Sequence, residues 1–173
     1  FKVSLRSDAP TQPFDFTFSG QADLSGEAPN GTFSLSGSAL GELLSTPEPA
    51  RWRLGESPDL NGRLSILGGE VKAELSGAGE TALLAVDVNA VDFGALFAMA
   101  NLGEVDAQLN GRGEFRPIGL SPTGSFAFSA TSPIPGLETS LTLDLTGRLD
   151  ASAMKVNARS NYGNDLVLVA DVA

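Results

Sequence analysis

The chain has 173 residues, a net charge of −10, and neither cysteine nor histidine. These two absences exclude disulfides, thiolate nucleophiles, zinc sites of the usual kind and Ser–His relays within this segment. The 11 Lys and Arg residues are scattered singly among 21 Asp and Glu residues, which disfavours nucleic acid and anionic membrane surfaces as partners.

Both ends of the chain resemble strands, with FKVSLR at the start and DLVLVADVA at the end. There is no initiator methionine, no signal peptide and no apolar stretch of about 18 residues that could span a membrane. We therefore expect residues 1–173 to form a single all-β domain that has been cut from a longer chain.

Apolar and polar residues alternate along most of the chain, as in strands that have one buried and one solvated face. Clusters of Gly, Pro, Asn and Asp separate the alternating runs. In chain order the runs are residues 14–20, 32–37, 63–67, 70–77, 105–111, 125–131, 137–147, 154–160 and 166–172. The pattern predicts roughly a dozen short strands in a mostly antiparallel sheet.

Two stretches depart from this alternation. In residues 91–103 the apolar side chains recur at helical spacing, after Asp92 as an N-cap and before Gly103 as a stop, which predicts one short amphipathic helix. Residues 38–52 begin like a helical turn and continue as a Pro-rich loop.

A short word, Leu followed by a small polar residue and then Gly, recurs at irregular spacing. It occurs at Leu24, Leu35, Leu60, Leu75, Leu109 and Leu145. We interpret the Leu as the last inward residue of a strand, and the Gly as a residue that leaves the inward face empty so that the sheet can bend.

Three copies of this word are followed by arginine, at Arg63, Arg112 and Arg148. We expect these arginines to point outward at a rim. The alternative is that they form a set that grips anionic headgroups.

With these features the sequence resembles the TamB family of AsmA-like bacterial envelope proteins. The likeness rests on the repeated Leu-x-Gly words and on residues 91–117, which resemble the family's short helix followed by a strand reading Val-x-Ala-x-Leu-x-Gly-x-Gly. It also rests on residues 119–130, where a Pro and a Gly introduce the next strand. The Pro-rich residues 46–58 depart from the uniform strand ladder of the family.

The resemblance implies an elongated sheet curled into an open apolar groove, often called a β-taco. It also implies a periplasmic segment of a protein anchored in the inner membrane of a Gram-negative envelope. Family members are associated with phospholipid transport between the membranes and with assembly of outer-membrane proteins and autotransporters. The implied partners are phospholipid acyl chains or unfolded outer-membrane protein strands, a TamA-like outer-membrane partner of the Omp85 class, and neighbouring segments of the same chain.

We predict that the inward, groove-lining face consists of the apolar residues at alternate positions of the strands. These are Phe16, Phe18, Phe33, Leu35, Leu64, Ile66, Val71, Leu75, Leu109, Phe126, Phe128, Leu141, Leu143, Leu145, Val156, Val167 and Val169. The alternative fold is a closed β-sandwich or barrel in which the same residues form a dry core. Alternation alone does not separate the two folds, because both require one apolar face per strand.

Two other functions compete with the groove, and one metal site is a further candidate. A structural or adhesive segment of a large surface protein would use the same strands with a filled core. A glycosidase would need paired carboxylates, for which Asp87 with Asp92, or Asp144 with Asp150, are candidates by proximity in sequence. A calcium site at Asn161, Asn164 and Asp165 is less favoured than a hairpin turn of the same composition. We expect no catalysis, no cofactor and no metal.

Overall fold

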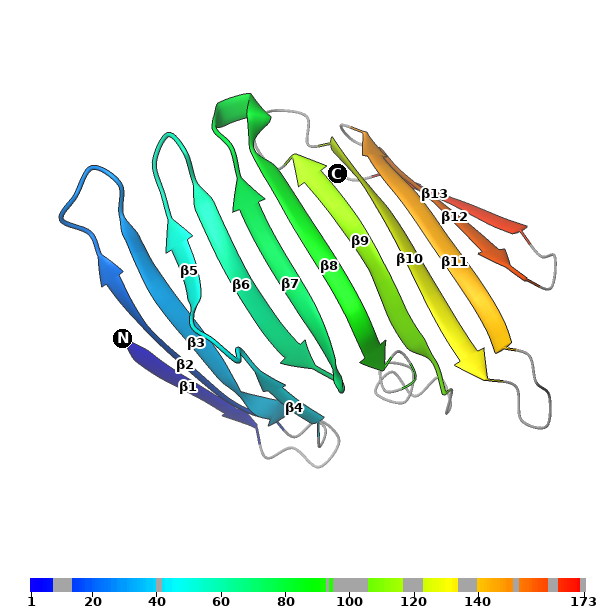
Figure 1. Cartoon of the computed structure of the whole chain (residues 1–173), viewed down its shortest axis with the longest axis horizontal. Coiled ribbons are helices and arrows are strands. Elements are labelled where there is room, and N and C mark those ends of the chain that lie inside the picture. The colour runs from blue at the N-terminus through cyan, green and yellow to red at the C-terminus, as the bar shows by residue number, and fades with distance from the viewer. Residues whose placement is uncertain are drawn as a thin grey trace.

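In the computed structural model, residues 1–7, 14–39, 42–92, 94, 106–116, 123–133, 140–150, 153–161 and 165–171 are described. Nearly all of them belong to one antiparallel sheet (Figure 1). The strands are β1 (Lys2–Ser7), β2 (Phe14–Asp23), β3 (Asn30–Ala39), β4 (Glu42–Ser45), β5 (Ala50–Arg53), β6 (Asp59–Ile66), β7 (Gly69–Ser76), β8 (Leu83–Asp92), β9 (Gln108–Arg116), β10 (Thr123–Pro133), β11 (Ser140–Asp150), β12 (Ala153–Ser160) and β13 (Asp165–Asp171). A 3-10 turn, η1 (Gly79–Thr81), joins β7 to β8.

Each strand pairs with the next one along the chain, except at β4 and β5. These two short strands share one place between β3 and β6. The sheet thus confirms the expected all-β, mostly antiparallel architecture. It is neither a closed barrel nor a sandwich, because the described strands form a single layer.

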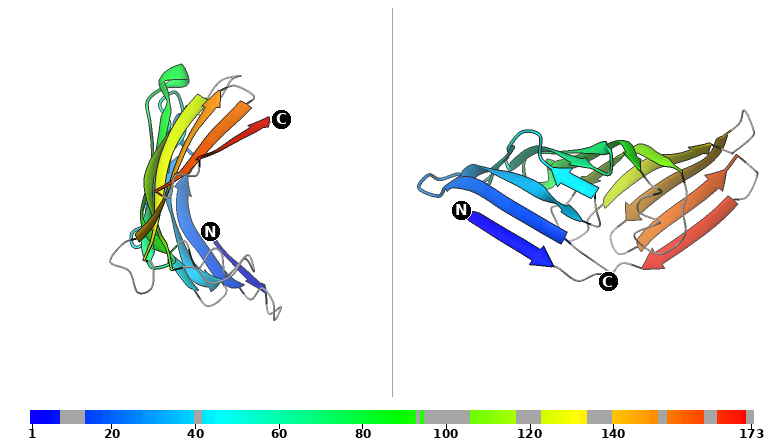
Figure 2. Two further views of the ribbon diagram at one scale, coloured as in Figure 1. Left: turned by 90° about the vertical axis from the view of Figure 1, so that its right-hand side faces the viewer. Right: turned by 90° about the horizontal axis from the view of Figure 1, so that it is seen from below.

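The sheet is strongly curved. Figure 2 shows that the end strands β1 and β13 lie on the same side of the central strands, so the sheet forms an open arch. Among the described residues, no helix has the length and apolar character needed to cross a membrane.

For residues 38–52 the helical turn was a wrong prediction, whereas the Pro-rich loop is present but confined to residues 46–49. Residues 38 and 39 complete β3, and β4 and β5 follow. Residues 46–49 form a bulge between β4 and β5, where two prolines are tolerated because the bulge needs fewer ladder hydrogen bonds. A few apolar residues in this stretch suggested a helix. Instead β4 and β5 each pair with both β3 and β6, and this pairing stabilises the extended conformation.

Thr46 supplies the hydrogen bonds that the bulge would otherwise lose. Its Oγ1 accepts a hydrogen bond of 3.0 Å from the backbone N–H of Leu35, and its own N–H donates to the Leu35 carbonyl at 2.8 Å. The side chain therefore stands in for a strand partner where the ladder is interrupted.

Replacing Thr46 with valine, which keeps the shape but removes the acceptor, should lower the free energy of unfolding by about 1 kcal/mol. Thr46→Ser retains the hydroxyl and serves as the control. Urea unfolding of both variants measures the difference, and equal stability of the two would show that the Leu35 N–H does not depend on this oxygen.

Most of the helix expected at residues 91–103 lies outside the described residues. Val91 and Asp92, at its expected start, are the last residues of β8, and Gly94 is helical. Near its end β8 contains a bulge between Val88 and Val91, where Ala90 has a φ of 51°. The Oδ1 of Asn110 accepts a hydrogen bond of 2.8 Å from the Ala90 N–H and so holds this bulge against β9.

Candidate functional site

The register separates the side chains of the sheet into two faces, because residues paired directly across antiparallel strands lie on the same side. One row of the first face reads Phe18, Leu35 and, beyond the bulge, Leu64, Val71, Val88, Gly111, Phe128, Leu145 and Ala158. The neighbouring row of the opposite face reads Arg63, Lys72, Asp87, Arg112, Ala127, Thr146 and Asn157. From β2 to β12 one face is thus mostly apolar, and the other is mostly polar.

The apolar face is the inner side of the arch. Side chains on the concave side of a curved sheet converge and shelter one another, whereas those on the convex side spread into solvent. The apolar side chains are mostly half-buried, and the polar side chains are mostly exposed. We call these two surfaces the inner face and the outer face (Figure 2).

Most of the predicted groove residues lie on the inner face. They are Phe16, Phe18, Phe33, Leu35, Leu64, Ile66, Val71, Leu75, Leu109, Phe126, Phe128, Leu141, Leu143, Leu145 and Val156. All are half-buried except Leu141, which is 39% exposed at the start of β11. They form one continuous surface that spans strands β2 to β12.

Val167 and Val169 do not share this register. Val167 pairs with Asn157 and Val169 with Lys155, which are outer-face positions, whereas Leu166 and Leu168 pair with Ala158 and Val156. The prediction for these two valines therefore needs correction. Four consecutive apolar residues, 166–169, carry no alternation, so only the pairing with β12 assigns their faces.

Several inner-face residues were absent from the prediction. The clearest are Leu84, Val86 and Val88 on β8, which pair with Leu75, Ala73 and Val71. Their alternation with Ala85 and Asp87 is readable in the sequence. Phe115, Leu149 and Met154 extend the same face at the ends of β9, β11 and β12.

Four of the six Leu-x-Gly words lie inside strands, not at their ends. Their glycines are Gly37, Gly62, Gly111 and Gly147, and each is at an inner-face position. The other two are exposed: Gly26 follows the end of β2, and Gly77 follows β7 with a φ of 93°. The interpretation as strand ends therefore holds only for Gly26 and Gly77.

Aromatic rings from neighbouring strands lie over most of the inner-face glycines. A Cβ on Gly37 would meet the ring of Phe16 at 2.7 Å, and one on Gly31 would meet the ring of Trp52 at 2.9 Å. Likewise the ring of Phe126 covers Gly147, and that of Phe128 covers Gly111. The glycines thus let the rings lie flat against the sheet, which is the arrangement known as aromatic rescue of glycine.

A line of small side chains runs along the inner face across the central strands. It consists of Ala50, Gly62 and Ala73, on the neighbouring strands β5, β6 and β7. The rows on either side carry larger aliphatic residues, which are Leu60 with Leu75 and Leu64 with Val71. The inner face therefore carries its smallest side chains where β5, β6 and β7 lie side by side.

Nothing in the described part of the chain forms a second layer over the inner face. The accessible surface is 11314 Å², whereas a compact monomer of this size exposes roughly 8,000 Å². Among the described residues, no large side chain is fully buried, and the buried apolar residues are Ala50, Leu67, Ala82, Val91, Ala107 and Ala130. The apolar face is therefore left half in contact with water, which is unfavourable unless something covers it.

Ion pairs on the outer face connect β6 to β7 and β8 to β9. Arg63 lies 4.0 Å from Glu70, and Arg112 lies 3.7 Å from Asp87 and 3.0 Å from Glu114. The Lys72 ammonium donates a hydrogen bond of 2.9 Å to Glu74 and holds the pKa of that carboxyl below its ordinary value. All these groups are exposed or half-exposed, so each pair contributes little to stability.

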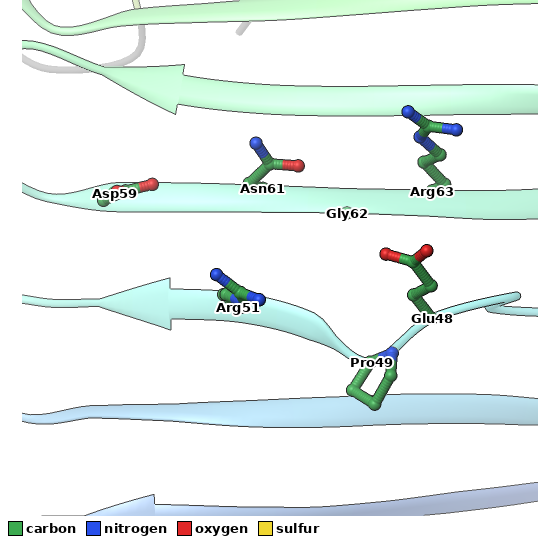
Figure 3. A pocket seen from close by; sticks show the side chains of 7 residues that line it. All are labelled: Glu48, Pro49, Arg51, Asp59, Asn61, Gly62 and Arg63. Carbon is green, nitrogen blue, oxygen red and sulfur yellow. The ribbon is translucent and has the colours of Figure 1, made fainter.

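A shallow hollow of about 340 Å³ lies on the outer face beside the bulge (Figure 3). Glu48 and Arg51 border it on one side, and Asp59, Asn61 and Arg63 on β6 border it on the other. All five side chains are exposed. The hollow is lined by both charge signs and lies on the opposite side of the sheet from the inner face.

The candidate carboxylate pairs are too far apart for glycoside hydrolysis. Asp144 and Asp150 lie on one strand, β11, and six residues of strand span about 20 Å. Asp87 and Asp92 are likewise separated along β8, and Asp87 is paired with Arg112. Carboxylates that cleave glycosidic bonds lie about 5 to 9.5 Å apart.

Of the proposed calcium ligands, Asn161 has its side chain engaged elsewhere. Its Oδ1 accepts from the Thr142 N–H at 3.1 Å, and its Nδ2 donates to the Ser140 carbonyl at 2.8 Å. The side chain thus caps the start of β11. Asn164 lies outside the described residues, and Asp165 begins β13.

The inner face is the feature that distinguishes this sheet from an ordinary globular domain. It is continuous and apolar, and no other layer of the described chain covers it. No protein-family model, curated protein or solved structure matches the chain. The case for a function therefore rests on this surface.

Proposed function

We propose that the inner face binds acyl chains, so that the domain acts as a passive apolar groove that conveys phospholipid between the inner and outer membranes. The observation that carries this proposal is a continuous apolar surface on a single-layer sheet. When a flexible apolar ligand replaces the water on such a surface, the free energy of the system falls. The module then needs no catalytic residue.

The lining favours a ligand without polar features. On β6 to β12, every described inner-face residue is apolar or glycine, except Ser132 and Ser160. Sites for specific small molecules instead combine apolar walls with a few placed polar groups. An acyl chain needs no such groups, and each methylene removed from water contributes about 0.8 kcal/mol.

The dimensions of the sheet also suit a chain-like ligand. Twelve strand positions at about 4.8 Å spacing give a curved path of roughly 55 Å. A ligand could lie along it and move without breaking any specific contact.

The cellular setting that we propose follows the resemblance to the TamB family. The domain would lie in the periplasm, within a protein anchored in the inner membrane, and would work with a TamA-like outer-membrane partner of the Omp85 class. Neighbouring segments of the same chain would continue the sheet. The end strands β1 and β13 support this, because each pairs on one side only among the described strands.

The same open edges favour a second function, which is assistance in assembly of outer-membrane proteins and autotransporters. An unfolded strand could add to an unpaired edge through backbone hydrogen bonds. A structural or adhesive role would require the inner face to be filled by neighbouring elements.

Photo-crosslinking tests the acyl-chain proposal. A crosslinker at Leu75 or Phe128, on the inner face, should capture acyl chains, whereas one at Glu74 or Ala127, the adjacent outer-face residues, should not. Mass spectrometry of the purified domain should also detect bound phospholipid. A lipid-free protein, with inner and outer positions equally silent while crosslinkers work elsewhere, would exclude the groove.

A further inference from the structure

Three basic residues gather on the outer face at the ends of β9 to β12. Arg148 lies directly opposite Ser125 on one side and Lys155 on the other. Arg116 on β9 lies directly opposite Thr123, which is two residues before Ser125 on β10. We call Arg116, Arg148 and Lys155 the basic cluster.

The basic cluster lacks the compensation found elsewhere on this face. Arg63 and Lys72 are also directly opposite each other, but each has a carboxylate within 4.0 Å. In the part of the chain that the structure describes, no such ion pair involves Arg116, Arg148 or Lys155. Like charges placed directly opposite each other destabilise a sheet, so an anion bound beside Arg148 would reduce its repulsion with Lys155.

A hollow of about 370 Å³ lies within the cluster, and Arg116 and Arg148 both line it. The hydroxyl-bearing residues Thr123 and Ser125 line it as well. Glu114 is the acidic residue of the lining, and its carboxylate is already engaged by Arg112 at 3.0 Å. Two guanidinium groups with adjacent hydroxyls match the oxygens of a phosphate group.

We propose that this hollow binds a phosphate-type anion, held by Arg116 and Arg148 with Lys155 beside them. The proposal does not rest on the acyl-chain function, because the hollow is on the other face of the sheet. The net charge of −10 repels anions from the chain as a whole. Binding of a phosphate would therefore have to come from a local concentration of positive charge, such as the one in this hollow.

The test is a titration of the whole chain with glycerol 3-phosphate, a soluble phosphate monoester, followed by calorimetry or amide NMR shifts. We expect saturable binding that the Arg116→Gln/Arg148→Gln double variant weakens at least about tenfold. The matched control is Arg51→Gln/Arg53→Gln, which removes the same charge from the outer face where Arg53 faces Asp59. No saturable binding by the wild type, or an equal loss in both variants, overturns the proposal.

Lys155→Glu should change the stability of the domain and its phosphate affinity in opposite directions. It should raise the unfolding midpoint, because the residue opposite Arg148 becomes oppositely charged, and it should weaken glycerol 3-phosphate binding. If Lys155 affected only the stability of the sheet, its replacement would change the unfolding midpoint and leave the phosphate affinity unchanged. Unchanged phosphate affinity would contradict the site as proposed.

Vesicles distinguish the two sources of the phosphate. If phosphatidylcholine vesicles containing phosphatidic acid bind the wild type and not the Arg116→Gln/Arg148→Gln variant, the ligand is a lipid headgroup. If glycerol 3-phosphate binds and the vesicles do not, the ligand is a soluble phosphate ester. Binding of an uncharged monoacylglycerol tests the inner face alone. The acyl-chain proposal and the phosphate proposal can therefore fail independently of each other.

Discussion

Replacing Gly147 with valine is expected to lower the free energy of unfolding by about 2 kcal/mol, although valine is the better strand former. A Cβ at this position would collide with the ring of Phe126 on the neighbouring strand. In a strand without such a ring, the same change would stabilise the sheet by up to about 1 kcal/mol. The sign of the change in urea unfolding therefore decides whether the ring lies over the glycine.

The control for this prediction is Thr146→Val on the same strand, where the exposed outer-face position should change stability by less than about 0.5 kcal/mol. A double-mutant cycle gives the sharper test. In Phe126→Ala/Gly147→Val the new side chain occupies the space that the ring has left, so the two losses should fall short of additive by at least about 1 kcal/mol. Additive losses would contradict the ring–glycine contact.

Aspartate in place of Leu145 should reduce binding of an uncharged monoacylglycerol at least about tenfold. Leu145 is half-buried on the inner face between Phe128 and Ala158. An ionised carboxylate there either keeps its water and displaces the ligand, or loses the water at a cost of several kcal/mol. Calorimetry or fluorescence displacement measures the loss of affinity.

Thr146→Asp, one residue further on, adds the same charge to the outer face and should leave binding unchanged. A thermal melt by circular dichroism establishes that both variants are folded. If Leu145→Asp unfolds the domain, Leu141→Asp replaces it, because Leu141 is 39% exposed and needs little packing. Equal affinity of the inner-face and outer-face variants would contradict binding at the inner face.

The alternation of residue types predicted the strands well where it was clear. Residues 14–20, 70–76 and 125–131 all lie within observed strands, and their apolar members other than Ala127 lie on the inner face. The prediction failed where the alternation is absent. Val167 and Val169 stand in an unbroken apolar run, and residues 38–52 combine a few apolar residues with prolines that turn out to lie in a bulge.

The role of the recurring glycines depended on residues far away in the sequence. Gly147 is covered by Phe126, and Gly37 by Phe16, each from an adjacent strand more than 20 residues earlier. The Leu-x-Gly word marks a place where the inner face has no side chain. The word does not say which aromatic ring covers the glycine, because the register of the adjacent strand brings ring and glycine together.

By itself, the sequence determined that each strand has one apolar and one polar face, because the period of two leaves no other arrangement. It also determined that the charged residues stay in water, since few apolar positions could shelter them. Only the tertiary structure decided that the apolar faces join into one concave surface without a second layer. The physical reason is that closed sandwiches and open sheets satisfy the same alternation. The difference lies in pairing and curvature: apart from β4 and β5, the strands pair in chain order through β13, and the curved sheet keeps its apolar side open.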